Sequence, residues 1–185
     1  MSTHSSRLRT LDMAYIALFA VLMAVCAWVT IPMPKPFVQF TLQTFAMFMA
    51  LVTLGGRRGL YAMVVYLLLG AVGVPVFSGF RGGLGVLLDT TGGYLVGFVA
   101  AAVVYWVITA KLGEGDGVKL AACLLGLAVC YAFGTLWFLL LYTRATGPIG
   151  LTTVLGWCVL PYIVPDLLKL ALALLLSKRV SPYLK

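Results

Sequence analysis

The stretch TTVLGWCVLPYIVPDLLKLALALLLS, residues 152–177, decides the fold class of this chain. Only two of its residues are charged, Asp166 and Lys169, and the others are apolar, small or uncharged. A helix of about 20 apolar residues crosses the roughly 30 Å hydrocarbon layer of a bilayer. The stretch therefore predicts a membrane-spanning helix, and Pro161 and Pro165 predict that this helix is kinked or restarted.

The rest of the chain repeats this apolar pattern. Of its 185 residues, 63% are apolar and 10% are charged, whereas soluble domains have about 45–50% and about 25%. A soluble globule is therefore excluded, and continuous rather than alternating apolar runs argue against a β-barrel. We predict an all-α polytopic membrane protein, one membrane domain over residues 1–185 in the lipid bilayer, with six transmembrane helices at about 13–31, 37–55, 59–77, 91–110, 120–142 and 152–177.

The charged residues indicate topology. The net charge is +8, from 13 Lys and Arg against 5 Asp and Glu. The basic residues stand in ones and twos between apolar runs and form no basic face, so no nucleic-acid partner is expected. With the amino terminus in the cytoplasm, nine of them lie inside and three outside, which predicts that both termini are cytoplasmic. The inner set is Arg7, Arg9, Arg57, Arg58, Lys111, Lys119, Lys178, Arg179 and Lys185, and the outer set is Lys35, Arg81 and Arg144.

Several classes of chemistry lack the residues they need. The four cysteines all lie inside apolar runs without CxxC spacing, which favours small packing residues over a metal site or a disulfide framework. The chain has no phosphate-binding GxxxxGK[ST] loop and no Ser/His/Asp or Cys/His set. We expect no enzyme, no metal and no cofactor, and we expect energy for any transport to come from another protein.

The connection over residues 74–90 differs from an ordinary loop. It is too apolar for a solvated loop and too rich in glycine to be helical throughout. Non-helical backbone at membrane depth persists only where protein buries it or a cavity hydrates it. This segment is predicted to be an outer, partly re-entrant cap over a pocket; the alternative is an apolar hairpin lying on the lipid surface.

Asp166 and Lys169 are the strongest candidates for a functional site. Each charge at the centre of a membrane helix costs about 2.5–3.5 kcal/mol on insertion scales, and a spacing of three places both on one helix face. They could form a self-neutralising structural pair, or they could bind a small amphipathic ligand with amide-like groups. A proton relay is disfavoured because no chain of further acids or histidines continues from them.

Other residues could complete or support such a site. Aromatic side chains supply candidate pocket walls, although helix packing or an interfacial belt is the alternative for each one. Gln43 needs a polar partner inside the membrane. Ala20 and Ala24 form a small-residue face that fits close packing inside the bundle or against a partner subunit. The candidate pocket residues are Gln43, Phe77, Tyr94, Tyr131 and Trp137.

Several motifs together are similar to one known family. GVPVFSG at 73–79, followed by glycine-rich sequence and TGGYLVGF at 91–98, resembles the signature of the BioY family, the biotin-binding S components of energy-coupling factor (ECF) transporters. The resemblance extends to QTF at 43–45, the GGRRG turn at 55–59, YAFGTLW at 131–137 and PYIVPDLLK at 161–169.

The resemblance implies a six-helix S-component fold in a prokaryotic cell membrane, with biotin bound from the outer side. It also implies a transmembrane coupling (T) subunit and two ABC-type ATPase subunits as partners. Asp166 and Lys169 would then hydrogen-bond the ureido group of biotin, or Lys169 would pair with its carboxylate. Arg81 is a second candidate for that anion, and Ala20 and Ala24 would contact the coupling subunit.

Two alternatives stay open at this stage. The chain could be an S component for a different vitamin, which ligand competition would reveal. It could also be a small membrane enzyme of lipid metabolism, which would need an acidic metal-binding cluster on the cytoplasmic side. Only Glu114 and Asp116 lie there, and they are better interpreted as part of a solvated turn.

Overall fold

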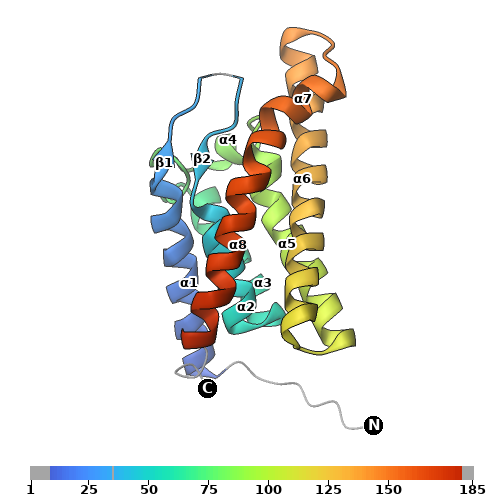
Figure 1. The fold of residues 1–185 in the computed structure, drawn as a ribbon. Helices are drawn as coiled ribbons and strands as arrows, with labels where there is room; N and C mark the ends of the chain where they lie inside the picture. Colours follow the sequence, from blue (N-terminus) through green and yellow to red (C-terminus); the bar gives the residue numbers. More distant parts are fainter. Residues whose placement is uncertain (1–8, 35, 181–185) are drawn as a thin grey trace, which may run out of the picture.

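The computed structural model describes residues 9–34 and 36–180 as one bundle of helices (Figure 1). Arg7, Lys35 and Lys185, which contributed to the predicted orientation, lie outside the described residues. In Figure 1 the first residues of α1 and the last residues of α8 lie at the same end of the bundle. The helices are α1 (Thr10–Trp28), α2 (Gln43–Leu54), α3 (Gly56–Ala71), α4 (Leu84–Leu87), α5 (Gly92–Leu112), α6 (Asp116–Thr146), α7 (Leu151–Cys158) and α8 (Leu160–Val180).

Four helical segments are long and apolar enough to cross a membrane: Thr10–Trp28, Gly92–Leu112, Asp116–Thr146 and Leu151–Val180. The helices α2 and α3 have 12 and 16 residues, fewer than the roughly 20 that span the hydrocarbon layer. The mostly helical, multi-pass membrane architecture agrees with the sequence prediction. The count of six spans and the cytoplasmic placement of the termini stay predictions.

Two predicted spans have different boundaries in the structure. The span expected at 37–55 becomes helical only at Gln43, because Phe40–Thr41 (β2) pairs antiparallel with Thr30–Ile31 (β1). Three prolines in the connection between the two strands, at 32, 34 and 36, disfavour helix there. The span expected at 59–77 ends at Ala71, where the chain turns into the outer segment.

The segment 74–90 is folded, with one helical turn, α4, and an isolated bridge between Phe77 and Arg81. Phe77 is 1% exposed and packs edge-on against the ring of Tyr66 on α3. The indole N–H of Trp28 donates to the carbonyl of Pro75 at 2.9 Å, which fixes the segment to α1. It is therefore neither helical throughout nor a free hairpin, and its role as a cap stays a prediction.

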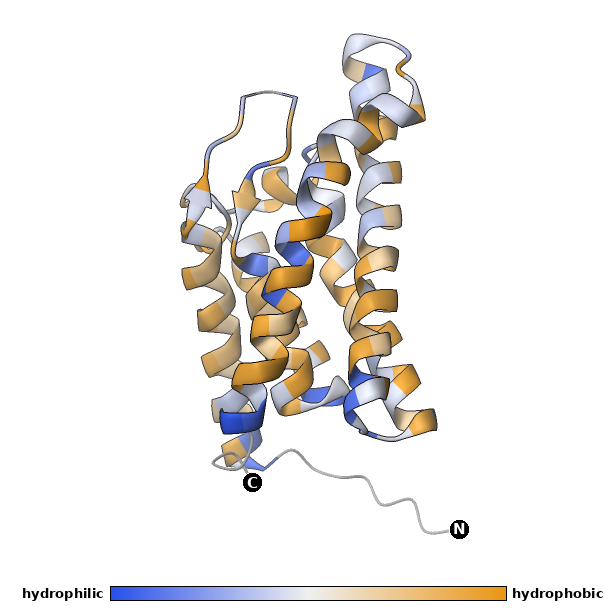
Figure 2. Ribbon diagram, in the orientation of Figure 1, coloured by the Kyte–Doolittle hydropathy of each residue, from blue (hydrophilic) through white to orange (hydrophobic). Residues whose placement is uncertain are grey.

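The core of the bundle combines alanine and methionine with large aromatic side chains, while many leucine and valine side chains are exposed on its outside. Ala20 and Ala24 on α1 are only 1% and 4% exposed. In this chain the two alanines pack inside the bundle, and the exposed side of α1 carries Leu18, Val21 and Val25. Their contact with a coupling subunit stays a prediction. Figure 2 shows hydrophobic colour over most of the helices, and polar residues at the bundle ends and at one internal level.

Candidate functional site

The internal polar level contains the pair Asp166–Lys169, in the middle of α8. The two residues are 3% and 8% exposed, and the Lys169 Nζ lies 2.7 Å from the Asp166 Oδ1. The chain restarts as α8 after a break at Val159, whose φ and ψ are −126° and −59°. This confirms the predicted restart near Pro161, and it orients the α8 face that carries both charges towards α2.

The carboxylate of Asp166 accepts hydrogen bonds from three helices. Thr44 on α2 donates from Oγ1 to Oδ1 at 2.8 Å, and Tyr131 on α6 donates its hydroxyl to Oδ2 at 2.5 Å. Lys169 on the same helix completes the set. Because hydrogen bonds to a charged acceptor are the strong ones, this carboxylate fixes α2, α6 and α8 at one level.

The ammonium of Lys169 is held by the β1–β2 hairpin as well as by Asp166. Its Nζ donates to the carbonyl oxygen of Thr41 at 2.7 Å and to the Thr44 Oγ1 at 3.0 Å. It also lies 4.2 Å from the ring centroid of Phe40, within cation–π range. The hairpin therefore covers the charged pair with one carbonyl and one aromatic face.

Gln43 belongs to an adjacent buried network. Its Nε2 donates to the Tyr66 hydroxyl at 2.5 Å, and that hydroxyl donates to the carbonyl of Val76 at 3.1 Å. On the other side, the Thr41 hydroxyl donates to the Gln43 Oε1 at 3.1 Å. Gln43 thus connects the hairpin beside Lys169 to the outer segment, and it does not contact the charged pair directly.

Tyr94 on α5 contacts α6 one helical turn further along from Tyr131. Its hydroxyl is 3.0 Å from the Oγ1 of Thr135, which follows Tyr131 by four residues on the same face of α6. The ring fits because residue 134 is glycine: a Cβ there would lie 2.2 Å from the Tyr94 ring. The structure therefore brings Tyr94 and Tyr131 to the same side of the bundle as Asp166.

Three predicted pocket residues make their described contacts elsewhere. Arg81 lies 3.7 Å from Asp89 and donates to the Ser78 carbonyl, and Trp137 donates to the Asp89 carbonyl at 3.0 Å. Phe77 belongs to the outer segment itself and packs edge-on against Tyr66 of α3. These three residues hold residues 74–90 in place, and the structure does not bring them to Asp166 and Lys169.

Sequence reasoning did not select Phe40, Thr41 or Thr44 as site residues, although all three contact Lys169. Thr44 carried a weak signal, because it stands beside Gln43 at the start of an apolar run. Phe40 was one of many aromatic candidates for the pocket walls, and nothing in the sequence distinguished it from the others. Thr41 carried no signal, because it contributes its backbone carbonyl, which every residue has. The described residues contain no group of three or more His, Cys, Asp or Glu able to hold a metal ion.

Together these residues offer a buried acceptor, a buried cationic donor and aromatic walls inside a bundle of membrane helices. That arrangement is of the kind found in membrane-embedded proteins that bind a small polar solute. The whole chain, residues 1–185, matches the BioY family, and the protein belongs to that family.

Individual relatives agree with this assignment. The chain is 36% identical to a probable biotin transporter BioY of Pyrococcus horikoshii, over 92% of this chain and 96% of that protein. It is 38% identical to the biotin transporter BioY of Thermotoga maritima, over 89% and 92% of the two chains. A crystal structure of the S-component for biotin from an ECF-type ABC transporter shares the fold, with a TM-score of 0.80 and 22% identity over 97% of this chain and 94% of that one.

Proposed function

We propose that this protein captures biotin in the membrane and delivers it for uptake as the substrate-binding S component of an ECF transporter. The observation that carries the proposal is the buried Asp166–Lys169 pair, which is costly at the centre of a membrane helix and has no catalytic partners. The names of the relatives point to biotin as the solute. The function is transport, and the chain is not an enzyme.

The chemistry of the pair suits the ureido ring of biotin. This ring presents N–H donors and one carbonyl acceptor. The Asp166 carboxylate accepts a ureido N–H, and the Lys169 ammonium donates to the ureido oxygen. Both groups already make hydrogen bonds, so the ligand replaces the Thr41 carbonyl or the Thr44 hydroxyl as a partner and leaves neither charge unpaired.

The carboxylate of biotin has two candidate partners. Lys169 is one of them, and Arg81 in the outer segment is the other. Arg81 is 43% exposed in its side chain and lies 3.7 Å from Asp89, so it can exchange a solvated ion pair for the ligand anion. Phe77, Trp137, Gln43 and Tyr94 support the walls of this pocket, and residues 74–90 close over it.

The proposed assembly rests on family membership and on the likeness to an S-component from an ECF-type ABC transporter; this sequence has no GxxxxGK[ST] nucleotide-binding loop of its own. The proposed partners are a transmembrane coupling subunit and two ABC-type ATPase subunits in a prokaryotic cell membrane. Within that assembly this chain has six membrane passages, with both termini on the cytoplasmic side.

Calorimetric titration of the detergent-purified protein with biotin tests the proposal, with desthiobiotin, lipoate, thiamine and riboflavin as comparators. We expect saturable one-to-one binding of biotin and no heat from thiamine or riboflavin. Asp166→Asn should weaken biotin binding about 10- to 100-fold, since a hydrogen bond to a charged group contributes about 1.5–3 kcal/mol.

The matched control is Asp116→Asn, which removes the same charge at the exposed start of α6 and should leave biotin affinity unchanged. Unaltered affinity in Asp166→Asn would refute the role of this carboxylate. Binding of another vitamin in place of biotin would keep the transporter class and reassign the ligand.

A further inference from the structure

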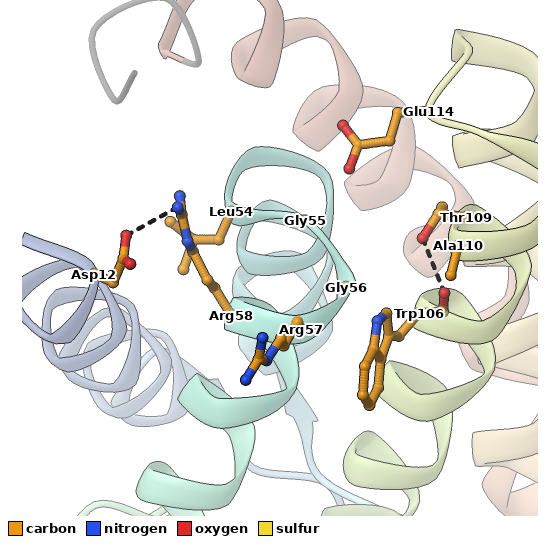
Figure 3. A pocket seen from close by; sticks show the side chains of 10 residues that line it. All are labelled: Asp12, Leu54, Gly55, Gly56, Arg57, Arg58, Trp106, Thr109, Ala110 and Glu114. Atoms are coloured by element: carbon orange, nitrogen blue, oxygen red, sulfur yellow. Dashed lines mark hydrogen bonds and ion pairs between the residues drawn. The ribbon is translucent and has the colours of Figure 1, made fainter. Parts of the chain in front are cut away.

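A polar cavity of about 320 Å³ lies where α2 meets α3, away from the charged pair (Figure 3). Leu54, in its wall, is ten residues along α2 from Thr44, which corresponds to about 15 Å of helix. In Figure 3 the side chains of Arg57 and Arg58 extend from the start of α3, with Asp12 of α1 on one side and Trp106 of α5 on the other. The cavity is therefore distinct from the proposed biotin site.

A second cavity, of about 310 Å³, is an apolar groove between α1 and α3. It is lined by Met13, Ile16, Ala17, Tyr61, Val64 and Val65. Met13 is 52% exposed, Ala17 is exposed, and the α3 residues are half-buried, so the groove opens on the outer surface of the bundle. In a membrane protein that surface faces the acyl chains.

The two cavities adjoin at one contact. The Arg57 Nε donates to the Tyr61 hydroxyl at 3.3 Å, and the guanidinium lies 5.8 Å from the centre of the Tyr61 ring. Arg57 lines the polar cavity and Tyr61 lines the groove. Because residues 57, 61, 64 and 65 are spaced by three and four, they follow one face of α3. The polar cavity and the apolar groove thus have neighbouring walls, at Arg57 and Tyr61.

The polar cavity is lined by two guanidinium groups, of Arg57 and Arg58, and by two carboxylates, of Asp12 and Glu114. Asp12 pairs with Arg58 and Glu114 lies 3.9 Å from Lys119, and the guanidinium groups suit a phosphate group. Arg58 Nη2 lies 2.9 Å from the Asp12 carboxylate. A guanidinium carries five N–H donors, so it can bind a phosphate oxygen and keep its existing contact. Other basic residues lie at the same end of the bundle, namely Lys111, Lys119, Lys178 and Arg179. Such clusters attract the anionic lipids of a membrane leaflet.

The indole of Trp106 adds a third feature of lipid-headgroup sites. Tryptophan is enriched at the level of the headgroups in membrane proteins. Here it lines the cavity beside Gly56, where a Cβ would lie 2.4 Å from the Trp106 Cα. Glycine at position 56 therefore lets α5 approach the start of α3 and places the indole against the polar cavity.

We propose that these two cavities form a binding site for one anionic phospholipid. Its phosphate contacts Arg57 and Arg58, and one of its acyl chains lies in the groove between α1 and α3. A free phosphate ion shares the headgroup chemistry but would leave the groove unfilled, whereas an uncharged or zwitterionic lipid would fill the groove with a weaker headgroup contact. The site does not depend on biotin binding, because neither cavity includes a residue of the charged pair.

Native mass spectrometry of the delipidated, detergent-solubilised protein tests this site. The ligands are phosphatidylglycerol, phosphatidylcholine with the same acyl chains, and glycerol 3-phosphate. We expect one molecule of phosphatidylglycerol to bind about fivefold or more tighter than phosphatidylcholine, and glycerol 3-phosphate alone not to bind. Equal affinity for the two lipids, or equal affinity for glycerol 3-phosphate, would overturn the proposal.

Two pairs of variants locate the binding. Arg57→Gln should bring phosphatidylglycerol affinity down towards that of phosphatidylcholine, and Arg57→Lys should keep most of the preference. Arg144→Gln, which removes one exposed arginine at the far end of α6, should have no effect. Loss of the preference in the Arg144 variant as well would mean that net charge alone selects the lipid, and this also overturns the site.

The groove is tested by Ala17→Leu, which fills it, against Ala14→Leu, the same change at an exposed position of α1 outside the groove. Ala17→Leu should weaken the binding of both lipids, and Ala14→Leu should not. The same spectra report the oligomeric state. If Ala17→Leu changes the fraction of dimer and leaves lipid binding intact, the groove is a surface between copies of this chain and the lipid proposal fails.

Discussion

Removing one charge of the buried pair should cost far more stability than removing both. In Asp166→Asn, the Lys169 ammonium stays buried without a countercharge; in Lys169→Met, the Asp166 carboxylate does. The two side chains are 4% and 9% exposed and lie 2.7 Å apart. Breaking such a pair by changing one partner costs about 3–5 kcal/mol, because the remaining charge is uncompensated in a low-dielectric environment.

In the double variant no charge is left, and the remaining loss is that of neutral hydrogen bonds. The Thr41 carbonyl and the Tyr131 hydroxyl lose a charged partner, which costs about 1–3 kcal/mol. The double variant should therefore be more stable than the sum of the two single changes predicts, by at least about 3 kcal/mol.

The assay is equilibrium unfolding in mixed detergent micelles, followed by tryptophan fluorescence for the wild type, both single variants and the double variant. Repeating the cycle with saturating biotin separates structure from binding, because the ligand should stabilise the wild type and not the double variant. Additive costs, to within about 0.5 kcal/mol, would show that the two charges are solvated independently and would refute the reasoning.

Two further predictions concern α6. Tyr131→Phe removes the hydroxyl that donates to Asp166 at 2.5 Å and should lower the free energy of unfolding by about 1.5–3 kcal/mol, measured by the same unfolding assay. Gly134→Ala places a Cβ about 2 Å from the ring of Tyr94 and should cost about 1–3 kcal/mol through overpacking, seen as a lower Tm. Gly156→Ala is its control, since nothing lies within 4 Å of a Cβ there; an equal loss of Tm in both would indicate a general effect of alanine at glycine positions.

Hydropathy predicted most of the fold because lipid imposes one simple requirement on a spanning helix. The apolar run at 13–31 became α1, and the run at 91–110 became α5. The run at 37–55 is not helical throughout. Hydropathy could not predict this, because an apolar hairpin and an apolar helix have the same composition. The pairing of Thr30 with Thr41 depends on tertiary contacts, which a hydropathy pattern does not reveal.

Only part of the candidate site could be predicted from the sequence, for a related reason. Asp166 and Lys169 were identifiable because a charge inside an apolar run is unusual. Their partners Thr41 and Thr44 lie more than 120 residues earlier in the chain. Which turn of α2 meets which turn of α8 depends on packing between the two helices, and no local pattern encodes that register.

The shortness of α2 has a consequence for backbone hydrogen bonding in the membrane. The 12 residues of α2 measure about 18 Å, which is less than the thickness of the hydrocarbon layer. The chain covers the remaining distance through β2, whose carbonyls are outside any helix. A bilayer supplies no water for such groups, and each must find a donor within the protein. Lys169 supplies one to the Thr41 carbonyl from the neighbouring helix, in the manner of a backbone N–H. The interrupted helix and the buried lysine therefore compensate each other's cost. The Thr41 carbonyl, which has no helical partner, gives the buried ammonium a hydrogen-bond acceptor. The ammonium in turn satisfies that carbonyl, so the backbone can be non-helical at this depth.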